Sequence, residues 1–371
     1  MPRRIAVTGT RGKSGVTRLV AAGLRASGAR VLAKTTGSKP VVILPDGSER
    51  EISRVGPPSV REQLRLVSLA AELGVDTLVA EMMSIGAECL AVESGRILRP
   101  HVLAVTNVRL DHLDEMGRDR AAVARTLGAA IPAGAEIFIP AEESGPVFEA
   151  ASGRRGARLH PVARDVAGAG PDGESDLPAG EFELNRRLAR AVLRSLGIDD
   201  GTIARGFGSA RPDPGGLRIR RGTYGRPPRP AICLSLFAAN DPESSSLALA
   251  RALASAPRCG RPLVGLLVLR EDRGDRTLQW VRAAAEGFFG DFAGVFLAGP
   301  PARAALRRIR RRTPADRPVF ALAPAGSPED IMSGLLSSIT AEPVVAGLGN
   351  FVGLGDEIGR YWDLRGTAYG A

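Results

Sequence analysis

The 371-residue sequence predicts an α/β protein of two domains, each with a mostly parallel β-sheet covered by helices. Three observations support this prediction. Short apolar runs alternate with helical patterns in both halves of the chain. A glycine-rich turn joins the first apolar run to the first helical pattern. A Pro- and Gly-rich stretch, residues 211–216, separates the halves and predicts domains of residues 1–213 and 214–371.

In the first half, the expected strands are short apolar runs and the expected helices repeat apolar residues every three or four positions. The predicted strands are residues 5–8, 30–34, 41–44, 49–53, 77–80, 102–106 and 137–139. The predicted helices are residues 16–26, 59–73 and 181–196. Pro45-Asp46-Gly47 indicates a hairpin turn, and Ser59 with Glu62 indicates a capping box. Residues 150–180 are expected to form a flexible surface excursion.

The second half repeats this alternation and predicts a smaller, Rossmann-like α/β domain. Its predicted strands are residues 231–237, 262–269, 294–297, 319–322 and, as the last of the chain, 344–346. Its predicted helices are residues 244–254, 277–288, 302–311 and 328–339.

The net charge of +10 favours anionic partners such as nucleotides, nucleic acid, anionic lipid or polyanions, although heavy use of arginine accounts for it equally well. Lys13, Lys34 and Lys39 are the only lysines among 50 basic residues. Because a planar guanidinium does not replace a compact ammonium everywhere, these lysines are candidates for positions that need a point charge.

Three lone cysteines without CxxC spacing fit a reducing compartment. No run reaches the roughly 20 apolar residues of a membrane span, and the start of the sequence does not resemble a signal peptide. We therefore expect a cytoplasmic protein, held at the inner face of the membrane through a partner if at all.

A phosphate-binding loop is predicted where a strand ends and a helix begins. The loop consists of Gly9, Thr10, Arg11, Gly12, Lys13 and Ser14. Its glycines let backbone N–H groups converge on phosphate oxygens at the helix N-terminus. Lys13 is expected to reach the β- and γ-phosphates of ATP, and Ser14 to bind Mg²⁺. The motif is shorter than the full Walker A, because Val7 stands at the place of its first glycine.

Polar residues follow two further predicted strands. Glu81 ends an apolar strand, where a carboxylate needs a partner such as Mg²⁺ or an arginine. Residues 106–114, TNVRLDHLD, follow the next strand and supply metal ligands and acid–base groups, including Asp111 and His112. Ligands of α/β proteins bind at such strand ends, which makes this edge the predicted site.

Together these strings resemble the ATPase signatures of Mur ligases, and more closely the ligase subunit of poly-γ-glutamate synthases. The strings are VTGTRGKS, Glu81 after a strand, and TNVRLDHLDEMG. The resemblance continues over most of the chain in Lys34-Thr35-Thr36-Gly37, Arg54 with Glu62-Gln63, FAANDP at 237–242, REDRGDRT at 270–277 and GLGN at 347–350.

The resemblance implies a Mur-ligase-like P-loop ATPase domain and an ADP-forming acid–amino-acid ligase that makes γ-glutamyl amide bonds through an acyl phosphate. It implies Ser14 and Glu81 as ligands of one Mg²⁺ and His112 as a ligand of a second. It implies nucleotide contacts for Asn185, Asn240 and Arg273, and substrate contacts for Lys34, Thr35, Thr36, Arg54 and Arg276. Lys13 and Arg109 would neutralise charge, and Asp111 or Asp241 would accept the amine proton; the sequence leaves that choice open.

The implied partners are glutamate, growing poly-γ-glutamate and a small integral membrane subunit, with a homo-oligomer as a further possibility. A folylpolyglutamate-synthetase-like or other Mur-type ligase is the alternative enzyme. The alternative from another class is a nucleotide switch or nucleic-acid-binding ATPase. Nucleic acid is not expected, because no basic patch is interleaved with aromatic residues.

Two features depart from the Mur pattern. The phosphate loop starts at residue 9, so we expect no N-terminal nucleotide-sugar domain. No lysine follows Lys39, so the carbamoylated lysine that Mur ligases use near the second metal has no counterpart.

Overall fold

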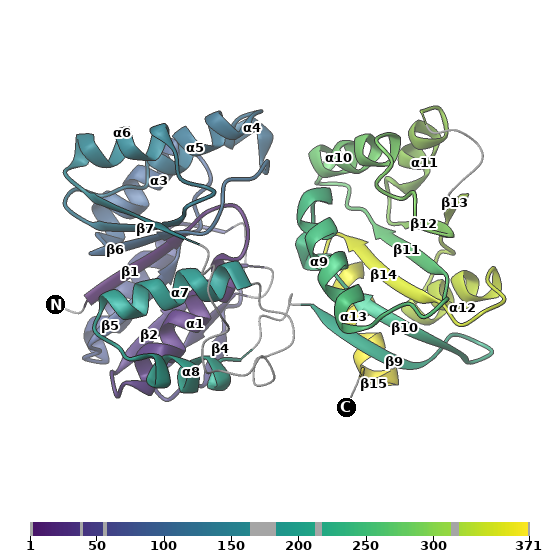
Figure 1. Ribbon diagram of the computed structural model, residues 1–371, viewed down its shortest axis with the longest axis horizontal. Helices are drawn as coiled ribbons and strands as arrows, with labels where there is room; N and C mark the ends of the chain where they lie inside the picture. The colour runs from purple at the N-terminus through teal and green to yellow at the C-terminus, as the bar shows by residue number, and fades with distance from the viewer. Residues whose placement is uncertain are drawn as a thin grey trace. The chain divides into compact units, whose positions relative to one another are not determined.

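The computed structural model describes residues 3–37, 40–54, 58–163, 183–211, 217–312 and 319–369. The chain forms two compact units, residues 1–214 and 215–371, each built around its own sheet (Figure 1). The predicted α/β class is confirmed. The predicted separating stretch at 212–216 and the part of the predicted excursion at 164–180 lie outside the described residues.

The sheet of the first unit has eight strands in the order β4-β3-β2-β5-β1-β6-β7-β8. They are β1 (Arg3–Thr8), β2 (Val31–Lys34), β3 (Val41–Ile43), β4 (Glu49–Glu51), β5 (Thr77–Glu81), β6 (Val102–Val105), β7 (Glu136–Pro140) and β8 (Arg158–Val162). All neighbours from β2 to β8 in this order pair in parallel, and β3 and β4 form an antiparallel edge.

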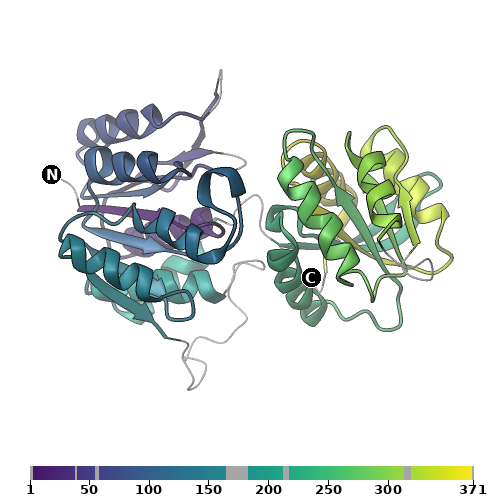
Figure 2. The ribbon, with the colours of Figure 1, turned by 90° about the horizontal axis from the view of Figure 1, so that it is seen from above.

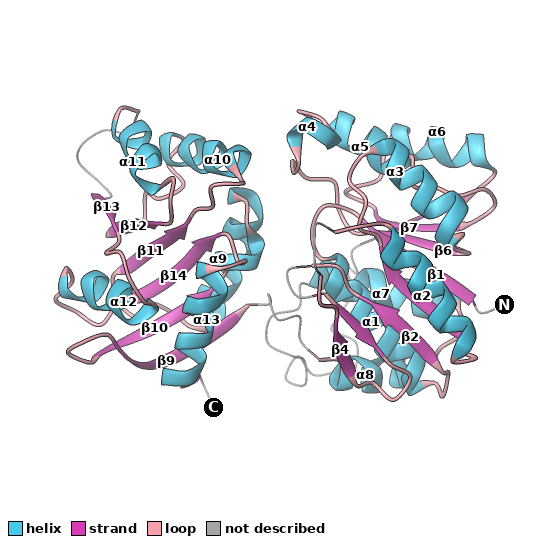
Figure 3. Ribbon diagram, turned by 180° about the vertical axis from the view of Figure 1, so that it is seen from behind, coloured by secondary structure: helices cyan, strands magenta, loops and turns pink. Residues whose placement is uncertain are grey.

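Helices cover both faces of this sheet, as a mostly parallel sheet requires (Figures 1 and 3). They are α1 (Lys13–Ala26), α2 (Arg61–Glu72), α3 (Ala87–Val92), the π-helix η1 (Glu93–Leu98), α4 (Leu113–Met116), α5 (Arg120–Gly128), α6 (Pro146–Arg155), α7 (Glu183–Ser195) and α8 (Asp200–Ser209). One core joins the sheet to α1, α7 and α8, and the other joins it to α2, η1, α5 and α6. Seen from above, the two helical layers flank the strands (Figure 2).

The sheet of the second unit has seven strands in the order β13-β12-β11-β14-β10-β9-β15. They are β9 (Arg218–Tyr224), β10 (Arg229–Ser235), β11 (Leu263–Val268), β12 (Gly294–Ala298), β13 (Val319–Leu322), β14 (Val344–Gly349) and β15 (Gly366–Ala368). The helices are η2 (Phe237–Ala239), α9 (Pro242–Ser255), α10 (Gly274–Ala285), α11 (Ala302–Arg310), α12 (Pro328–Ser337) and α13 (Leu354–Arg365). The strands from β13 to β10 pair in parallel, whereas β9 and β15 are antiparallel.

Several elements differ from the prediction. Part of the expected excursion is ordered as α6 and β8, and β14 is not the last strand, because α13 and β15 follow it. The polar strand β9, RIRRGTY, was not predicted from the sequence. Strands β8 and β15 lie at sheet edges and β9 is polar; for such strands, pairing with a neighbour decides the conformation more than apolar composition does.

The parallel register brings four strand ends to one edge of the first sheet. Val7 of β1 pairs with Glu81, the last residue of β5. Thr8 pairs with Val105, the last residue of β6. Lys34, the last residue of β2, lies beside Ala80. The segments that follow these strands are therefore neighbours, although they lie far apart in the sequence.

Candidate active site

The phosphate loop follows β1 and ends at α1, as predicted. Its backbone depends on Gly9 and Gly12, whose φ angles are +123° and +77°. A Cβ on Gly9 would lie 2.1 Å from Oγ1 of Thr106, and one on Gly12 would lie 2.4 Å from Oδ1 of Asn185. Glycine is thus required twice, for its backbone conformation and for the close approach of neighbouring segments. The contact also places Asn185, the predicted nucleotide residue of α7, against the loop.

Lys13 is the first residue of α1, and its ammonium lies within the loop. Its Nζ donates to the carbonyl oxygens of Gly9 at 2.7 Å and Thr10 at 3.3 Å. Burial lowers the pKa of Lys13, and the negative charges of Glu81 and Asp111 oppose that change. The ammonium is therefore held where phosphate oxygens would approach the loop.

Ser14 and Glu81 are in direct contact. The Ser14 hydroxyl donates to Oε2 of Glu81 at 2.8 Å, and the backbone N–H of Thr36 donates to the same oxygen at 2.7 Å. Both side chains are buried. The structure therefore brings the two residues expected to hold Mg²⁺ together, beside the segment after β2 that contains Thr36.

Thr35 has a second role that the sequence did not suggest. Its hydroxyl accepts a hydrogen bond from the N–H of Val41 at 3.3 Å, and its own N–H donates to the Val41 carbonyl. Thr35 thus joins β2 to β3. The next residue, Thr36, points its backbone N–H at the Glu81 carboxylate.

Asn107 fastens the phosphate loop to the end of β6. Its Oδ1 accepts from the Thr10 hydroxyl at 2.6 Å and from the Arg11 N–H at 3.0 Å, and its Nδ2 donates to the Arg11 carbonyl at 3.0 Å. The N–H of Arg109 donates to the Thr10 hydroxyl at 3.0 Å. Asn107 was not assigned a role from the sequence; its position directly after a buried strand, two residues before Arg109, was the available signal.

The rest of this string places Asp111 and His112 beside the loop. Arg11 Nη1 lies 3.2 Å from Oδ2 of Asp111, and His112 Nε2 lies 3.8 Å from the same oxygen. His112 has a φ of +46°, which is uncommon for a residue other than glycine. Such strain in a non-glycine residue is concentrated at functional sites.

Lys34, Arg54 and Glu62 form a charge cluster in which Lys34 is buried and the other two side chains are partly buried. Arg54 donates two hydrogen bonds to Glu62, at 2.8 and 3.0 Å, and Lys34 Nζ lies 3.1 Å from Oε2 of Glu62. Burial raises the pKa of Glu62, but the hydrogen bond from Arg54 and the charge of Lys34 outweigh it and lower the pKa to about 2. Burial lowers the pKa of Lys34, against the effect of Glu62.

The predicted capping box at Ser59 and Glu62 is therefore wrong. Helix α2 begins at Arg61 with Val60 at the N-cap position and no side-chain cap. The Glu62 carboxylate faces Arg54 and Lys34 instead, because a charged pair outweighs the weak contact of 3.5 Å with the Ser59 N–H.

The second unit gathers its own predicted residues. Asp241 caps α9 by accepting from the Ser244 N–H at 2.9 Å. Asn240 has a φ of +60°, and its carbonyl accepts from Trp280 Nε1 at 3.1 Å. Arg276 Nη1 donates to Asn350 Oδ1 at 3.2 Å. The turn at 237–242, helix α10 and the GLGN string are thus joined inside this unit. Arg273 pairs with Asp275 at 3.0 Å.

Comparison with known proteins finds one matching family for each unit. Residues 7–129 match the family described as the Mur ligase middle domain, and residues 223–365 match the poly-gamma-glutamate synthase CapB C-terminal domain. The first unit thus matches a Mur ligase middle domain, and the second matches the C-terminal domain of a poly-gamma-glutamate synthase. The two matches fall on separate units and include the phosphate loop, Glu81 and His112 in the first and Asn240 and Arg276 in the second.

Two curated relatives carry the name CapB, as does the family that matches the second unit. The chain is 30% identical to the capsule biosynthesis protein CapB of Bacillus anthracis over 284 residues, 76% of this chain and 60% of that protein. It is 29% identical to the PGA synthase CapB of Bacillus subtilis (strain 168) over 282 residues, 76% of this chain and 70% of that protein. The match thus spans less than two thirds of the Bacillus anthracis protein.

Solved structures share the fold over almost the whole chain. The bifunctional folylpolyglutamate synthase/dihydrofolate synthase of Yersinia pestis, in complex with AMPPNP and Mn ion, has a TM-score of 0.69 at 19% identity, over 97% of this chain and 89% of that chain. The folylpolyglutamate synthase of Mycobacterium tuberculosis, in complex with ADP and AMPPCP, has a TM-score of 0.64 at 22% identity, over 95% and 90%.

The residues around the phosphate loop fit ATP with Mg²⁺. A hydroxyl and a carboxylate oxygen, at Ser14 and Glu81, are the hard ligands that Mg²⁺ prefers, and Mg²⁺ usually completes its shell with water and phosphate oxygens. Among the described residues, no three His, Cys, Asp or Glu side chains are grouped so that they could hold a metal by themselves.

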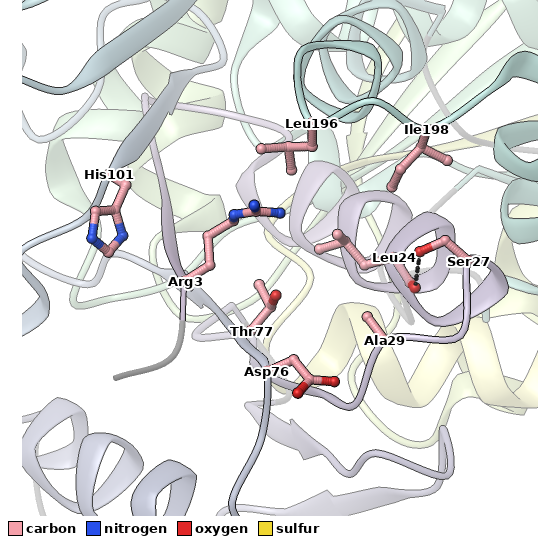
Figure 4. Close-up of a pocket in the computed structure, with 9 residues that line it drawn as sticks. All are labelled: Arg3, Leu24, Ser27, Ala29, Asp76, Thr77, His101, Leu196 and Ile198. Atoms are coloured by element: carbon pink, nitrogen blue, oxygen red, sulfur yellow. Dashed lines mark hydrogen bonds between the residues drawn. The ribbon is translucent and has the colours of Figure 1, made fainter.

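One described cavity lies elsewhere in the first unit. It has a volume of about 510 Å³ and opens at the amino ends of the strands (Figure 4). Its lining residues are Arg3, Leu24, Ser27, Ala29, Asp76, Thr77, His101, Leu196 and Ile198. These residues lie at or next to the starts of β1, β5 and β6 or the ends of α1 and α7, so the cavity is at the end of the sheet opposite the phosphate loop. No predicted site residue lines it. No helix in the described part of the chain has the length and apolarity needed to cross a bilayer.

Proposed function

We propose that this chain is an ATP-dependent, ADP-forming ligase that makes γ-glutamyl amide bonds. The observation that carries the proposal is the contact of Ser14 with Glu81 beside the phosphate-loop lysine. It occurs in a unit that matches the Mur ligase middle domain, and the second unit matches the poly-gamma-glutamate synthase CapB C-terminal domain. Both halves of the chain support the same reaction class.

The proposed reaction has two steps. A carboxylate oxygen of the acceptor attacks the γ-phosphorus of ATP, the bond to the β-phosphate oxygen breaks, and ADP leaves with an acyl phosphate as the other product. The amine of the incoming amino acid then attacks the acyl carbon, phosphate leaves with the bonding electrons, and the amine gives up a proton. Phosphoryl transfer of this kind depends mainly on positioning and charge neutralisation.

The chain's own residues are assigned to these needs. Lys13 binds phosphate oxygens, which replace the loop carbonyl of Gly9 as hydrogen-bond acceptors. Arg109, whose backbone N–H donates to the Thr10 hydroxyl, neutralises the negative charge of the phosphates. Ser14 and Glu81 hold Mg²⁺, which when bound shields the phosphate charge. Asp111 or Asp241 accepts the amine proton. Asp111 is already engaged by Arg11, which stabilises its anionic form.

Further assignments follow the predicted motifs. Asn185 contacts the nucleotide, since its side chain packs against Gly12 of the phosphate loop. Asn240 and Arg273 contribute nucleotide contacts from the second unit, and His112 assists a second cation. The predicted substrate contacts are Lys34, Thr35, Thr36, Arg54 and Arg276. Arginine suits carboxylate substrates, because its guanidinium pairs with them through two hydrogen bonds.

Glutamate is the proposed substrate. The curated relatives are named as capsule and PGA synthase proteins, and one structure of a bifunctional folylpolyglutamate synthase/dihydrofolate synthase with the same fold has Mn, AMPPNP and L-glutamate bound. A capsule polymer has to cross the membrane. We therefore also propose that the chain works on the cytoplasmic face with a small integral membrane subunit.

A folylpolyglutamate-synthase-like activity is the second candidate. It is favoured by the TM-score of 0.69 with the Yersinia pestis bifunctional enzyme over 97% of this chain. Both candidates add glutamate through ATP, so the acceptor separates them.

The test is a screen of ADP release by the purified chain. L-glutamate, D-glutamate, oligo-γ-glutamate, a folate and a UDP-muramyl peptide are offered in turn, with Lys13→Ala as the blank. Stimulation by glutamate or its oligomer supports the proposal. Stimulation by the folate or the muramyl peptide alone keeps the ligase class and overturns the substrate. ADP release that no amine stimulates would support a nucleotide switch instead.

A further inference from the structure

A second buried carboxylate lies behind Glu81. Glu93, the first residue of η1, is completely buried. Its carboxylate accepts hydrogen bonds from the backbone N–H groups of Met83 at 3.0 Å and Ser84 at 2.9 Å, and from Gln63 Nε2 at 2.7 Å. These three donors are all uncharged. Neither the resemblance nor the predicted site included Glu93.

The contacts of Glu93 lead directly to Glu81. Gln63, itself completely buried on α2, also donates from Nε2 to the main-chain carbonyl of Glu81 at 2.9 Å. The backbone from Glu81 to Ser84 is thus held by three hydrogen bonds. The Glu93 carboxylate accepts from the N–H groups of Met83 and Ser84, and the Gln63 amide, which also donates to Glu93, donates to the Glu81 carbonyl. At the other side of Glu81, the carboxylate accepts from Ser14 and from the Thr36 N–H.

Such an arrangement is unfavourable for stability alone. A buried carboxylate loses its hydration, and neutral hydrogen bonds compensate for that loss only in part. A neutral Gln or Asn would hold a turn with less desolvation. The carboxylate of Glu93 is, however, held on the backbone N–H groups of Met83 and Ser84, directly after Glu81 in the chain. A buried negative charge at this position also favours a divalent cation bound nearby.

We propose that Glu93 is a positioning residue for the divalent-cation site: it fixes the backbone that follows β5, so that the Glu81 carboxylate faces Ser14, and it adds negative charge behind that pair. The proposal rests on the proposed function, because the cation is the one that accompanies ATP. Gln63 is the link through which Glu93 holds the Glu81 carbonyl.

The test measures cation binding and needs no turnover. Free Mn²⁺ is titrated by electron paramagnetic resonance into the full chain with a non-hydrolysable ATP analogue. Glu93→Gln keeps the shape but removes the charge and turns one acceptor into a donor that faces the Gln63 amide. Residues that support metal ligands typically contribute about tenfold to 100-fold in metal affinity, and we expect a loss in this range. Binding of the analogue without metal should stay near the wild-type value.

Two reference variants set the scale. Glu81→Gln removes the proposed ligand itself and gives the largest loss. Asp199→Asn removes a carboxylate that accepts the Thr202 N–H at 2.9 Å at the start of α8, far along the chain from β5, and should leave Mn²⁺ binding unchanged. Circular dichroism and thermal unfolding check that each variant is folded. If Glu93→Gln does not fold, Gln63→Met breaks the link with a neutral side chain and decides the question by the same titration.

The outcomes separate the two proposals. Wild-type Mn²⁺ affinity in folded Glu93→Gln, or in folded Gln63→Met if the first variant is unfolded, would overturn the positioning role and leave the proposed function standing. A wild-type chain that binds neither the ATP analogue nor Mn²⁺ would instead overturn the proposed function. Weaker Mn²⁺ binding with unchanged analogue binding supports both.

Discussion

Lys13 donates to two neutral carbonyls of its own loop, Gly9 and Thr10. Phosphate oxygens would replace these acceptors with charged ones and form stronger, charge-assisted hydrogen bonds. The loop therefore already holds the ammonium in the place where it is needed, and binding exchanges partners without moving the side chain far.

We predict that Lys13→Ala folds normally and loses ATP turnover. Lys13→Arg should fail as well, because a planar guanidinium does not fit a loop that surrounds a point charge. ADP release with glutamate present measures both, and circular dichroism checks the fold. Wild-type turnover in either variant would contradict this role for the lysine.

Gly12→Ala tests the close approach of α7 to the loop. The backbone at φ +77° is strained for alanine by roughly 1–2 kcal/mol, and the added Cβ would collide with Asn185. We expect weaker nucleotide binding together with lower stability. Gly28→Ala is the matched control, since its φ is +92° and no atom lies within 4 Å of the added Cβ. Both variants share the backbone strain, so equal nucleotide affinity in the two would show that the contact with Asn185 does not matter.

Glu81→Ala and His112→Ala should each lower the rate by at least about tenfold, on the order of 1.4 kcal/mol. The reason for Glu81 is the loss of the oxygen that Ser14 contacts. For His112 it is the loss of the proposed ligand to a second cation. Steady-state rates at increasing Mg²⁺ or Mn²⁺ test this, and excess cation should partly restore a variant that has lost a ligand. Activity without any divalent cation would contradict the assignment.

At the scale of elements, the cluster of Lys34, Arg54 and Glu62 ties the end of β2 to the start of α2. Its hydrogen bonds and charges favour the carboxylate form of Glu62 in the folded state. In the unfolded chain these partners are lost. The protonation of Glu62 is thus coupled to the packing of α2 against the end of β2.

This coupling predicts an acid-dependent loss of stability. The pKa of Glu62 is lowered from 4.5 to about 2 on folding, so its stabilising effect is complete above pH 4.5 and is lost as the pH falls towards about 2. Urea unfolding at pH 7, 4.5 and 3 should show a smaller decrease for Glu62→Gln than for the wild type, from a lower starting value. Glu72→Gln, an exposed position of the same helix, should follow the wild type. Parallel curves for Glu62→Gln and wild type would exclude this coupling.

At the scale of the whole molecule, the residues that we propose for the reaction belong to two units, each with its own core. The first unit supplies the phosphate loop and Glu81. The second supplies Asn240, Asp241 and Arg276, which its own contacts hold in place. A ligase needs both the phosphoryl donor site and the amino acid site, so neither unit is expected to act alone.

We predict that the isolated chain makes short γ-linked oligomers or none, and that long polymer requires membranes containing the partner subunit. The assay supplies ATP and glutamate to the chain with and without such membranes. Product that a γ-glutamyl hydrolase digests and ordinary proteases leave intact identifies the linkage. Equally long polymer from the chain alone would show that no membrane partner is needed.

The sequence by itself determined the α/β class, most of the long helices and buried strands, and the position of the phosphate loop. These features are local: they depend on apolar periodicity over a few residues and on glycines at a strand–helix junction. Glu81 was found for the same reason, because a carboxylate at the end of an apolar strand is unusual wherever that strand pairs.

Only the tertiary structure decided which polar groups meet. Ser14 and Glu81 are 67 residues apart, and Thr10 and Asn107 are 97 apart; they touch because β5 and β6 pair on either side of β1. Glu62 faces Arg54 and Lys34 and does not cap its own helix, and Glu93, for which the sequence predicted no role, is buried behind Glu81. The physical reason is that a buried polar group must be satisfied by whatever partners the fold brings to it, and strand order, which local periodicity does not specify, selects those partners.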